Sequence, residues 1–224
     1  LLLPMMIPPH VTAIAWTQAL GPSSSLLGWL GLAPPAGSSN PIQTPAGLVA
    51  LLTVQHLPIT LLLMQTTLRT LPGDLVDAAR MAGARSPLLM RRVLLPLLIP
   101  SLVAAATLSF IAALGNFGIN ALIGIPARFT TLPVLIWQRL SSFGPSVLGE
   151  VATLAAILAL LALVLVLFSW WWLARARRAI PVSGSTLGDR SNVRHGAPGA
   201  AELVLWSFTL AALGFPLLSL VTGS

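Results

Sequence analysis

Five long apolar stretches constrain the fold of this chain more than any other feature. They cover residues 1–20, 48–68, 93–114, 151–173 and 203–221, and none of them contains Asp, Glu, Lys or Arg. At a rise of 1.5 Å per residue, runs of about 19–23 residues form helices roughly 30–35 Å long, which is enough to cross the hydrocarbon core of a bilayer. The sequence therefore predicts an all-α polytopic membrane protein with about five transmembrane helices, in contact with membrane lipid.

The composition supports a membrane protein and excludes several other classes. Hydrophobic residues make up 56% of the chain and charged residues only 8%, whereas a soluble domain of this length carries far more charged surface. The absence of cysteine excludes disulfides, thiolate metal sites and a cysteine nucleophile. No P-loop motif is present. We therefore expect no enzyme activity, no metal and no cofactor bound by this chain.

The basic residues indicate the topology. All twelve are arginine; five lie between residues 69 and 92, and five between 175 and 194. Because cytoplasmic loops are enriched in Lys and Arg, both clusters are placed in the cytoplasm. Segments 21–46 and 115–148 then lie outside, and the apolar stretch 131–140 is expected to form a short interfacial or re-entrant helix. Because the arginines are clustered in this way, the net charge of +7 is not taken as a sign of nucleic-acid binding. No nucleic-acid partner is expected.

The polar segment 174–202 divides the chain. Its Gly, Ser, Pro and Arg content is typical of a linker, so residues 1–173 are expected to form one transmembrane domain, a partial first half. Residues 203–224 would be the first transmembrane helix of a second half, with a lone C-terminal extension as the alternative. In the first apolar stretch, three prolines indicate that a regular helix begins only near His10 or that a preceding helix is cut off.

The loop between the second and third apolar stretches has its own structural signals. Asp74 can cap a short helix over residues 75–82, and Gly83 can end that helix in the left-handed conformation. Ser86 and Pro87 then supply the cap and first-turn proline of a new helix. These signals predict a cytoplasmic helix–turn–helix elbow that continues into the span at residue 93, although an ordinary amphipathic loop would carry similar signals.

The spacing of residues in this loop resembles that of a known motif. Asp77-Ala78-Ala79 is followed after three residues by Gly83, and after nine more by Val93-x-Leu95-Pro96. This is similar to the EAA loop of ATP-binding cassette (ABC) importer permeases, E-A-A, three residues, G, nine residues, I-x-L-P, with Asp in place of Glu and Val in place of Ile. The resemblance covers the loop 74–96 and most of the chain around it.

The resemblance implies a mechanism for the elbow. Asp77, Ala78, Ala79 and Gly83 would dock on an ABC ATPase subunit dimer, which uses the ATP, while Leu95 and Pro96 would begin the next transmembrane helix. It also implies a multi-pass protein of the bacterial inner membrane that receives substrate from a periplasmic substrate-binding protein.

Two further segments, 1–16 and 114–136, look like those of ferric-iron-type permeases, which commonly fuse two halves in one polypeptide. The resemblance thus implies import of ferric iron. The alternatives are import of aminoethylphosphonate, thiamine or a polyamine, or a non-transporting membrane scaffold. A membrane-embedded enzyme would need intramembrane acid–base or metal clusters, and the sequence shows none.

Polar residues inside the apolar stretches are candidates for a substrate path. They are His10, Gln18, Gln55, His56 and Gln65. Such groups avoid lipid, and they either form hydrogen bonds between helices or line a water-filled passage. The residues assigned to a possible translocation path are His10, Gln55, His56 and Asn116.

The segment 115–120 and two arginines are candidates on the outer side. Gly115, Asn116, Gly118 and Asn120 tolerate unusual backbone angles, which predicts a flexible patch, either a gate, a contact for the binding protein or a plain loop. The outer arginines, Arg128 and Arg139, would pair with acidic groups of a binding protein or remain solvated.

Overall fold

The structure is a computed structural model, and it describes residues 6–35, 37–71, 73–83, 85–142, 144 and 146–178, with isolated positions between 207 and 222. Within residues 6–178 the described elements are all helical. The predicted linker beyond residue 178 and most of the predicted fifth span lie outside the described residues. The chain divides into two compact units, one built mainly from residues 1–55 and 116–135, the other from 56–115 and 136–181.

Within the described residues, three of the five predicted spans are helices long and apolar enough to cross a membrane. They are Pro45–Thr70, Pro87–Leu114 and Val147–Arg175, with mean hydropathy of 1.8, 2.2 and 3.0 in their most apolar windows. Of the first apolar stretch the structure describes residues 6–20, and helix α2 within them covers Pro9–Leu20. Twelve residues reach about 18 Å, too short to cross the hydrocarbon core. As expected from the prolines, this helix begins next to His10.

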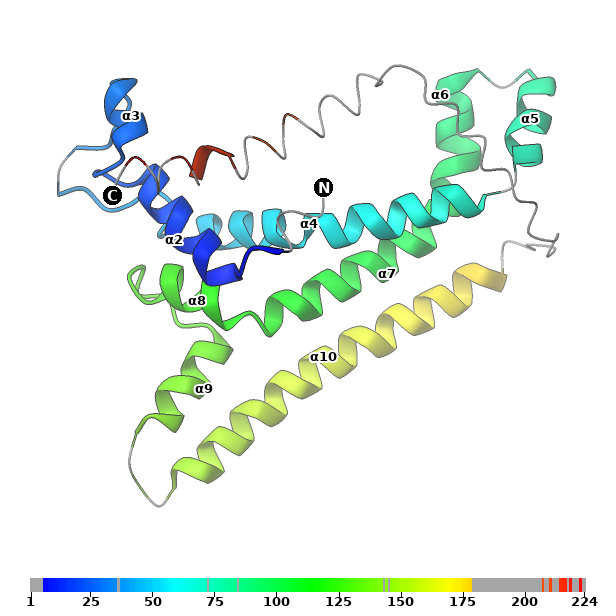
Figure 1. Ribbon diagram of the computed structural model, residues 1–224. Helices are drawn as coiled ribbons and strands as arrows, with labels where there is room; N and C mark the ends of the chain where they lie inside the picture. The colour runs from blue at the N-terminus through cyan, green and yellow to red at the C-terminus, as the bar shows by residue number, and fades with distance from the viewer. Residues whose placement is uncertain are drawn as a thin grey trace. The chain divides into compact units, whose positions relative to one another are not determined.

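The first unit packs α2 against α8 (Phe117–Gly124) and the first half of α4 (Pro45–Thr70) (Figure 1). Gly118 allows the close approach of α2, because a Cβ there would lie 3.2 Å from both the Cβ and the backbone nitrogen of His10. The core of this unit consists of small and branched side chains from the three helices and the preceding loop: Ala13, Ile42, Leu48, Leu51, Ile119 and Ile123.

The loop between α2 and α4 is held to α2 by an asparagine. Asn40 Nδ2 donates to the carbonyl oxygen of Thr17 at 2.7 Å, and Asn40 Oδ1 accepts from the backbone N–H of Ile42 at 3.2 Å. A short helix within this loop, α3 (Ser25–Trp29), is capped by the buried hydroxyl of Ser24. The segment expected to be an outer loop is therefore partly ordered by local capping.

Most of the segment 115–120 belongs to a helix and is not the loop that its Gly and Asn content predicted, while its role as a gate or as a contact for the binding protein stays a prediction. Gly115 ends α7 with an ordinary φ of −83°, and α8 begins two residues later. Asn116 Oδ1 accepts from the backbone N–H of Ile119 at 3.1 Å, so Asn116 caps α8. Ile119 and Ile123, one turn apart, are both fully buried. The prediction was wrong because the cap and this apolar pair outweigh the permissive backbone of the glycines.

The prediction of a short helix at residues 131–140 is confirmed. Helix α9 runs from Leu132 to Leu140. Its placement at a membrane interface stays a prediction.

The second unit contains the later half of α4 and the helices α5 (Gly73–Met81), α6 (Ser86–Leu89), α7 (Leu95–Leu114) and α10 (Val147–Arg178). In Figure 1, α10 runs beside α7, and the two helices are in contact. Two pairs of hydroxyl groups join α4 to α7: Thr60 with Ser109 at 3.1 Å, and Thr67 with Ser101 at 2.8 Å.

Helix α10 extends further than its apolar stretch. The polar linker was predicted from residue 174, but the helix continues to Arg178. One reason is local: the guanidinium of Arg175 lies 4.9 Å from the ring centroid of Trp171, one turn earlier. Such a cation–π contact stabilises the last turns, and arginine also suits the negative end of the helix dipole.

Candidate functional site

The candidate site is the elbow formed by α5 and α6, which connects α4 to α7. Helix α5 begins at Gly73, so Asp74 lies in its first turn instead of capping it. The carboxylate still lies at the helix N-terminus, where the helix dipole favours negative charge, and Arg80 occupies the last turn, where the dipole favours positive charge. The helix expected at residues 75–82 is thus present with its ends shifted by one or two residues.

Gly83 ends α5 as predicted from the sequence. Its φ is +82°, in the left-handed region, and its backbone N–H donates to the carbonyl oxygen of Arg80 at 2.9 Å. A Cβ built at this position meets no atom within 4 Å. The requirement for glycine at position 83 therefore comes from the backbone angle alone and not from crowding.

The chain restarts at Ser86, with Pro87 in the first turn as predicted, and continues through a wide turn into α7. Residues Met90–Leu94 form a π-helical turn, and the backbone N–H of Leu95 donates to the carbonyl oxygen of Met90, five residues earlier. Of the motif residues, Leu95 is the first residue of α7 and Pro96 the second. The predicted continuity of elbow and span is confirmed, but the π turn was not predicted.

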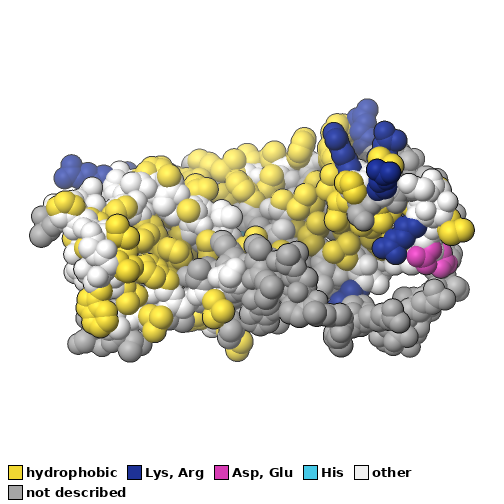
Figure 2. All heavy atoms as spheres, turned by 90° about the horizontal axis from the view of Figure 1, so that it is seen from above, with side chains coloured by type: hydrophobic (Ala, Val, Ile, Leu, Met, Phe, Trp, Pro, Cys, Tyr) yellow, Lys and Arg dark blue, Asp and Glu magenta, His cyan; other side chains and the backbone are white. Residues whose placement is uncertain are grey.

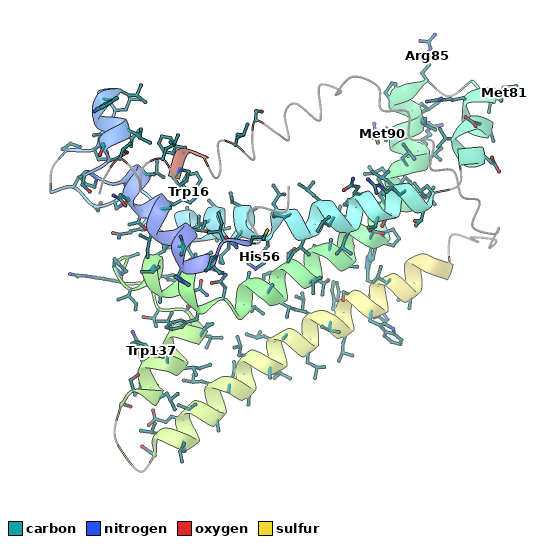
Figure 3. All side chains as sticks on the ribbon, in the orientation of Figure 1. Trp16, His56, Met81, Arg85, Met90 and Trp137 are labelled. Carbon is teal, nitrogen blue, oxygen red and sulfur yellow. The ribbon has the colours of Figure 1, made fainter. Side chains whose placement is uncertain are left out.

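The elbow presents positive charge and exposed apolar groups. The described arginines of the loop, Arg69, Arg80, Arg85, Arg91 and Arg92, are all exposed. Figure 2 shows dark blue side chains gathered at this end of the second unit, beside magenta carboxylates. In Figure 3, Arg85 points away from the tip of the turn between α5 and α6, and Met81 lies at the end of α5.

Two of the three consecutive motif residues of α5 are exposed. Asp77 and Ala78 are exposed, and Ala79 is half-buried. Met81 is 89% exposed and Met90 55% exposed. Within the described chain, Val76 and Ala79 of α5 are half-buried, whereas Ala82 is exposed. A helix of nine residues such as α5 is only marginally stable without tertiary contacts. A partner packed against its exposed face would therefore stabilise it.

The assignment of four residues to a translocation path stays a prediction, and the structure describes the environment of each. His10 is exposed on α2, whereas Gln55 and His56 are buried near the middle of α4 at 7% and 8% exposure. Asn116 is buried as the cap of α8, which gives this side chain a structural role. Of the other polar candidates, Gln65 is exposed, and Gln18 lines the cavity described below.

The two outer arginines differ in their environments. Arg139 pairs with Glu150 at 3.3 Å, and the two side chains are 54% and 46% exposed. This internal partner was not predicted. Arg128 is exposed and takes a left-handed backbone conformation, with φ of +55°.

The first unit contains a cavity that the sequence did not reveal. Its volume is about 460 Å³, and its polar lining is uncharged: Thr17, Gln18, Ser23, Asn40 and Gln43. These residues come from α2 and from the loop that Asn40 holds against it. Asn40 and Gln43 lie in a stretch of loop composition, so no periodicity pointed to them.

Comparisons with known proteins agree on the class of this chain. Residues 1–178 match the family model described as binding-protein-dependent transport system inner membrane component. A probable sulfate transport system permease protein, cysT, of Prototheca wickerhamii is 33% identical over 161 residues, covering 70% of this chain and 62% of that protein. An inner membrane ABC transporter permease protein of Escherichia coli, YdcU, is 33% identical over 170 residues, covering 70% of this chain and 53% of that protein.

A third relative is the molybdenum transport system permease protein ModB of Mycobacterium tuberculosis. It is 34% identical over 118 residues, covering 53% of this chain and 43% of that protein. In these matches the chain spans between about two fifths and three fifths of the length of its relatives. The relatives are transport permeases, and none of these three is described as an iron permease. The chain belongs to the inner membrane components of binding-protein-dependent transport systems, the permeases of ABC importers.

Proposed function

We propose that this chain forms part of the membrane permease of an ABC importer and that its α5–α6 elbow receives motion from a separate ATPase. The observation that carries the proposal is the elbow itself. A short helix with exposed Asp77 and Ala78, closed by Gly83 at φ +82°, leads directly into a membrane-crossing helix. The family membership supports the same role.

The exposed face of the elbow suits a protein partner. Met81 at 89% exposure is a flexible apolar side chain that adapts to a groove, and the surrounding arginines complement an acidic rim. An α5 helix that is marginal alone gains stability when its open face is covered. The partner in this proposal is an ATPase subunit dimer that binds and hydrolyses the ATP.

The rest of the proposed assembly follows from the family. A substrate-binding protein delivers the solute on the periplasmic side of the inner membrane, and the permease passes it to the cytoplasm. The arginine-rich elbow lies on the cytoplasmic side in this arrangement, as the positive-inside rule requires. Each nucleotide state of the motor must contact one permease conformation better than the other, because only differential binding shifts the equilibrium.

Copurification tests this proposal. The full-length protein is produced with candidate ATPases, and wild type is compared with a variant carrying Asp77→Arg and Gly83→Val. Arg139→Gln serves as the control, since it removes an exposed charge outside the elbow. We expect a stable complex for wild type and the control and its loss for the elbow variant. Complex formation that survives the elbow changes in a folded protein would contradict the proposal.

For the substrate, we propose a small tetrahedral oxyanion of the sulfate or molybdate type. The support comes from the relatives named as sulfate and molybdenum permeases, and they do not favour the ferric iron expected from the segments 1–16 and 114–136. The cavity of the first unit is compatible with an anion, because its neutral amide and hydroxyl groups can donate hydrogen bonds without holding the anion tightly.

Uptake by cells that produce the complete transporter distinguishes the substrates. Labelled sulfate, molybdate and ferric iron are offered separately and in competition. We expect saturable uptake of an oxyanion that the other oxyanion inhibits and that excess iron leaves unchanged. Uptake of iron alone would overturn the oxyanion assignment and leave the permease assignment standing, and so would uptake of labelled aminoethylphosphonate, thiamine or polyamine alone when these are offered in the same assay.

A further inference from the structure

The helix that joins the elbow to the membrane contains one irregular turn. Residues Pro87–Leu114 form a continuous helical span, but within it Met90–Leu94 are π-helical, with the Leu95 N–H bonded to the Met90 carbonyl oxygen. Single π turns are rare in proteins. Where they occur, they often lie at functional sites, and helices can bend at them.

The sequence explains why the wide turn lies at this position. In an α-helix, the carbonyl of Arg92 would accept a hydrogen bond from the amide of residue 96, but Pro96 has no N–H, and its ring would collide with that carbonyl. A wider turn relieves the collision. The same turn leaves a weaker hydrogen-bond ladder between the elbow and α7 than a regular helix would have.

On the α7 side of the turn, the helix is fixed to its neighbour. Thr67 Oγ1 donates to Ser101 Oγ at 2.8 Å. About two helical turns further from the π turn, Thr60 and Ser109 share a hydrogen bond of 3.1 Å. Two hydroxyl pairs at separate levels hold α4 and α7 in one register, since both would have to break for the helices to slide.

On the other side, the elbow is also a connected piece. Helix α5 contacts α6, and the backbone N–H of Leu89 donates to the carbonyl oxygen of Arg85 at 2.9 Å, so α6 continues up to the wide turn. The π turn thus separates two parts that are each internally bonded.

We propose that the π turn at Met90–Leu94 is a pivot, at which the elbow reorients relative to the hydroxyl-clamped α4–α7 pair when the motor changes its nucleotide state. This inference rests on the proposed function, because the motor supplies the force. In this proposal, the helix bends at residues 90–94. The Thr67–Ser101 and Thr60–Ser109 hydrogen bonds keep α4 and α7 moving together.

Distance measurements between spin labels test the pivot, and residues 1–224 contain no native cysteine, so labels can be placed at chosen sites among them. One pair, Met81→Cys with Leu102→Cys, spans the pivot; the other, Leu68→Cys with Leu108→Cys, spans the clamp. All four residues are exposed. A bend of about 20° moves each point beyond the pivot by roughly a third of that point's distance from the pivot. In the assembled transporter we expect a nucleotide-dependent change of several ångström for the first pair and none for the second.

Matched substitutions separate the pivot from a general loss of stability. Pro96→Ala restores an amide opposite Arg92 and should reduce the nucleotide-dependent change to less than half. Pro100→Ala removes the other proline inside the same helix, beyond the π turn, and should leave the change as in wild type. Thr67→Val should raise the population with separated α4 and α7 about threefold, the factor that a typical interhelical hydrogen bond contributes in a membrane.

Thr66→Val is the control for the clamp. The Thr66 hydroxyl donates only within its own helix in the structure, to the carbonyl oxygen of Leu63 at 2.9 Å, so the distance between α4 and α7 should not respond. A transporter that binds its ATPase and imports substrate with a constant Met81–Leu102 distance would overturn the pivot alone. A Pro96→Ala variant that moves as wild type does would also overturn it. A protein that binds no ATPase would remove both the pivot and the proposed function.

Discussion

Substitution of Gly83 tests the elbow most sharply, because the structure isolates one physical cause. The residue has φ of +82°, and a Cβ at this position would meet open space. Gly83→Val therefore introduces no clash, and its cost is the left-handed backbone of a β-branched residue, about 1–3 kcal/mol. Asn tolerates this conformation better, so Gly83→Asn should cost less.

Helix α5 is short and has few other contacts that could offset this cost. The α5 helix has nine residues, which is marginal without tertiary support. A penalty of about 1–3 kcal/mol lowers the population of the closed elbow by roughly 5–150-fold, and the affinity for a partner that recognises only the closed form falls by the same factor. We expect this weakening for Gly83→Val, with Gly83→Asn between Gly83→Val and wild type.

The assay is titration of the purified protein with its ATPase, together with the ratio of solute imported to ATP hydrolysed. Gly73→Ala is the control, since Gly73 also lies in α5 with open space around it but without a positive φ. The control should bind as wild type does. Equal affinity of Gly83→Val and wild type, or equal weakening of Gly73→Ala and Gly83→Val, would refute the reasoning.

Three further predictions concern stability, measured as thermal unfolding of the detergent-solubilised protein. Asn116→Ala removes the cap of α8 and should cost about 1 kcal/mol, while Asn116→Asp keeps the acceptor and most of the stability; equal loss for both would contradict the capping role. Gly47→Ala would push a Cβ into the carbonyl of Ile42 and should cost about 1–3 kcal/mol, whereas Gly149→Ala, with open space, should not destabilise. Glu150→Gln breaks the exposed pair with Arg139 and should change the free energy of unfolding by less than about 1 kcal/mol; a larger loss would show that the pair is more than a surface contact.

The parts of the fold that the sequence predicted are those with a strong local signal. The apolar stretches at 48–68, 93–114 and 151–173 correspond to α4, α7 and α10, because length without charge is sufficient evidence for a spanning helix. The break at Gly83 and the restart at Ser86 were also predicted, since a left-handed glycine and a first-turn proline act within a few residues.

The parts that were missed depend on competition between local signals or on contacts from elsewhere in the chain. Helix α8 was hidden because Gly and Asn indicated a loop, while the deciding contributions were the Asn116 cap and the burial of Ile119 and Ile123 against α2 and α4. The π turn was not predicted, because Pro96 alone is equally compatible with a kink or with the first turn of an α-helix.

The candidate site divides in the same way. Residues of the elbow lie close in sequence, so their grouping needed no tertiary information. The proposed path residues come from distant segments, and the structure places His10 on the surface and Asn116 in a cap. The cavity lined by Gln18, Asn40 and Gln43 exists because Asn40 forms a hydrogen bond with the backbone of Thr17. The periodicity of the sequence does not predict such a contact between separate segments.

Site-specific crosslinking from the elbow tests the central claim most directly. Residues 1–224 contain no native cysteine, so a photoreactive group can be attached at Met81→Cys, which is 89% exposed on α5, or at Leu108→Cys, which is 48% exposed on α7. In an assembled, active transporter, the label at position 81 should crosslink to the ATPase, with an efficiency that changes with nucleotide, and the label at position 108 should not. Transport and ATP hydrolysis without any crosslink from position 81 would contradict the assignment of α5–α6 as the coupling elbow.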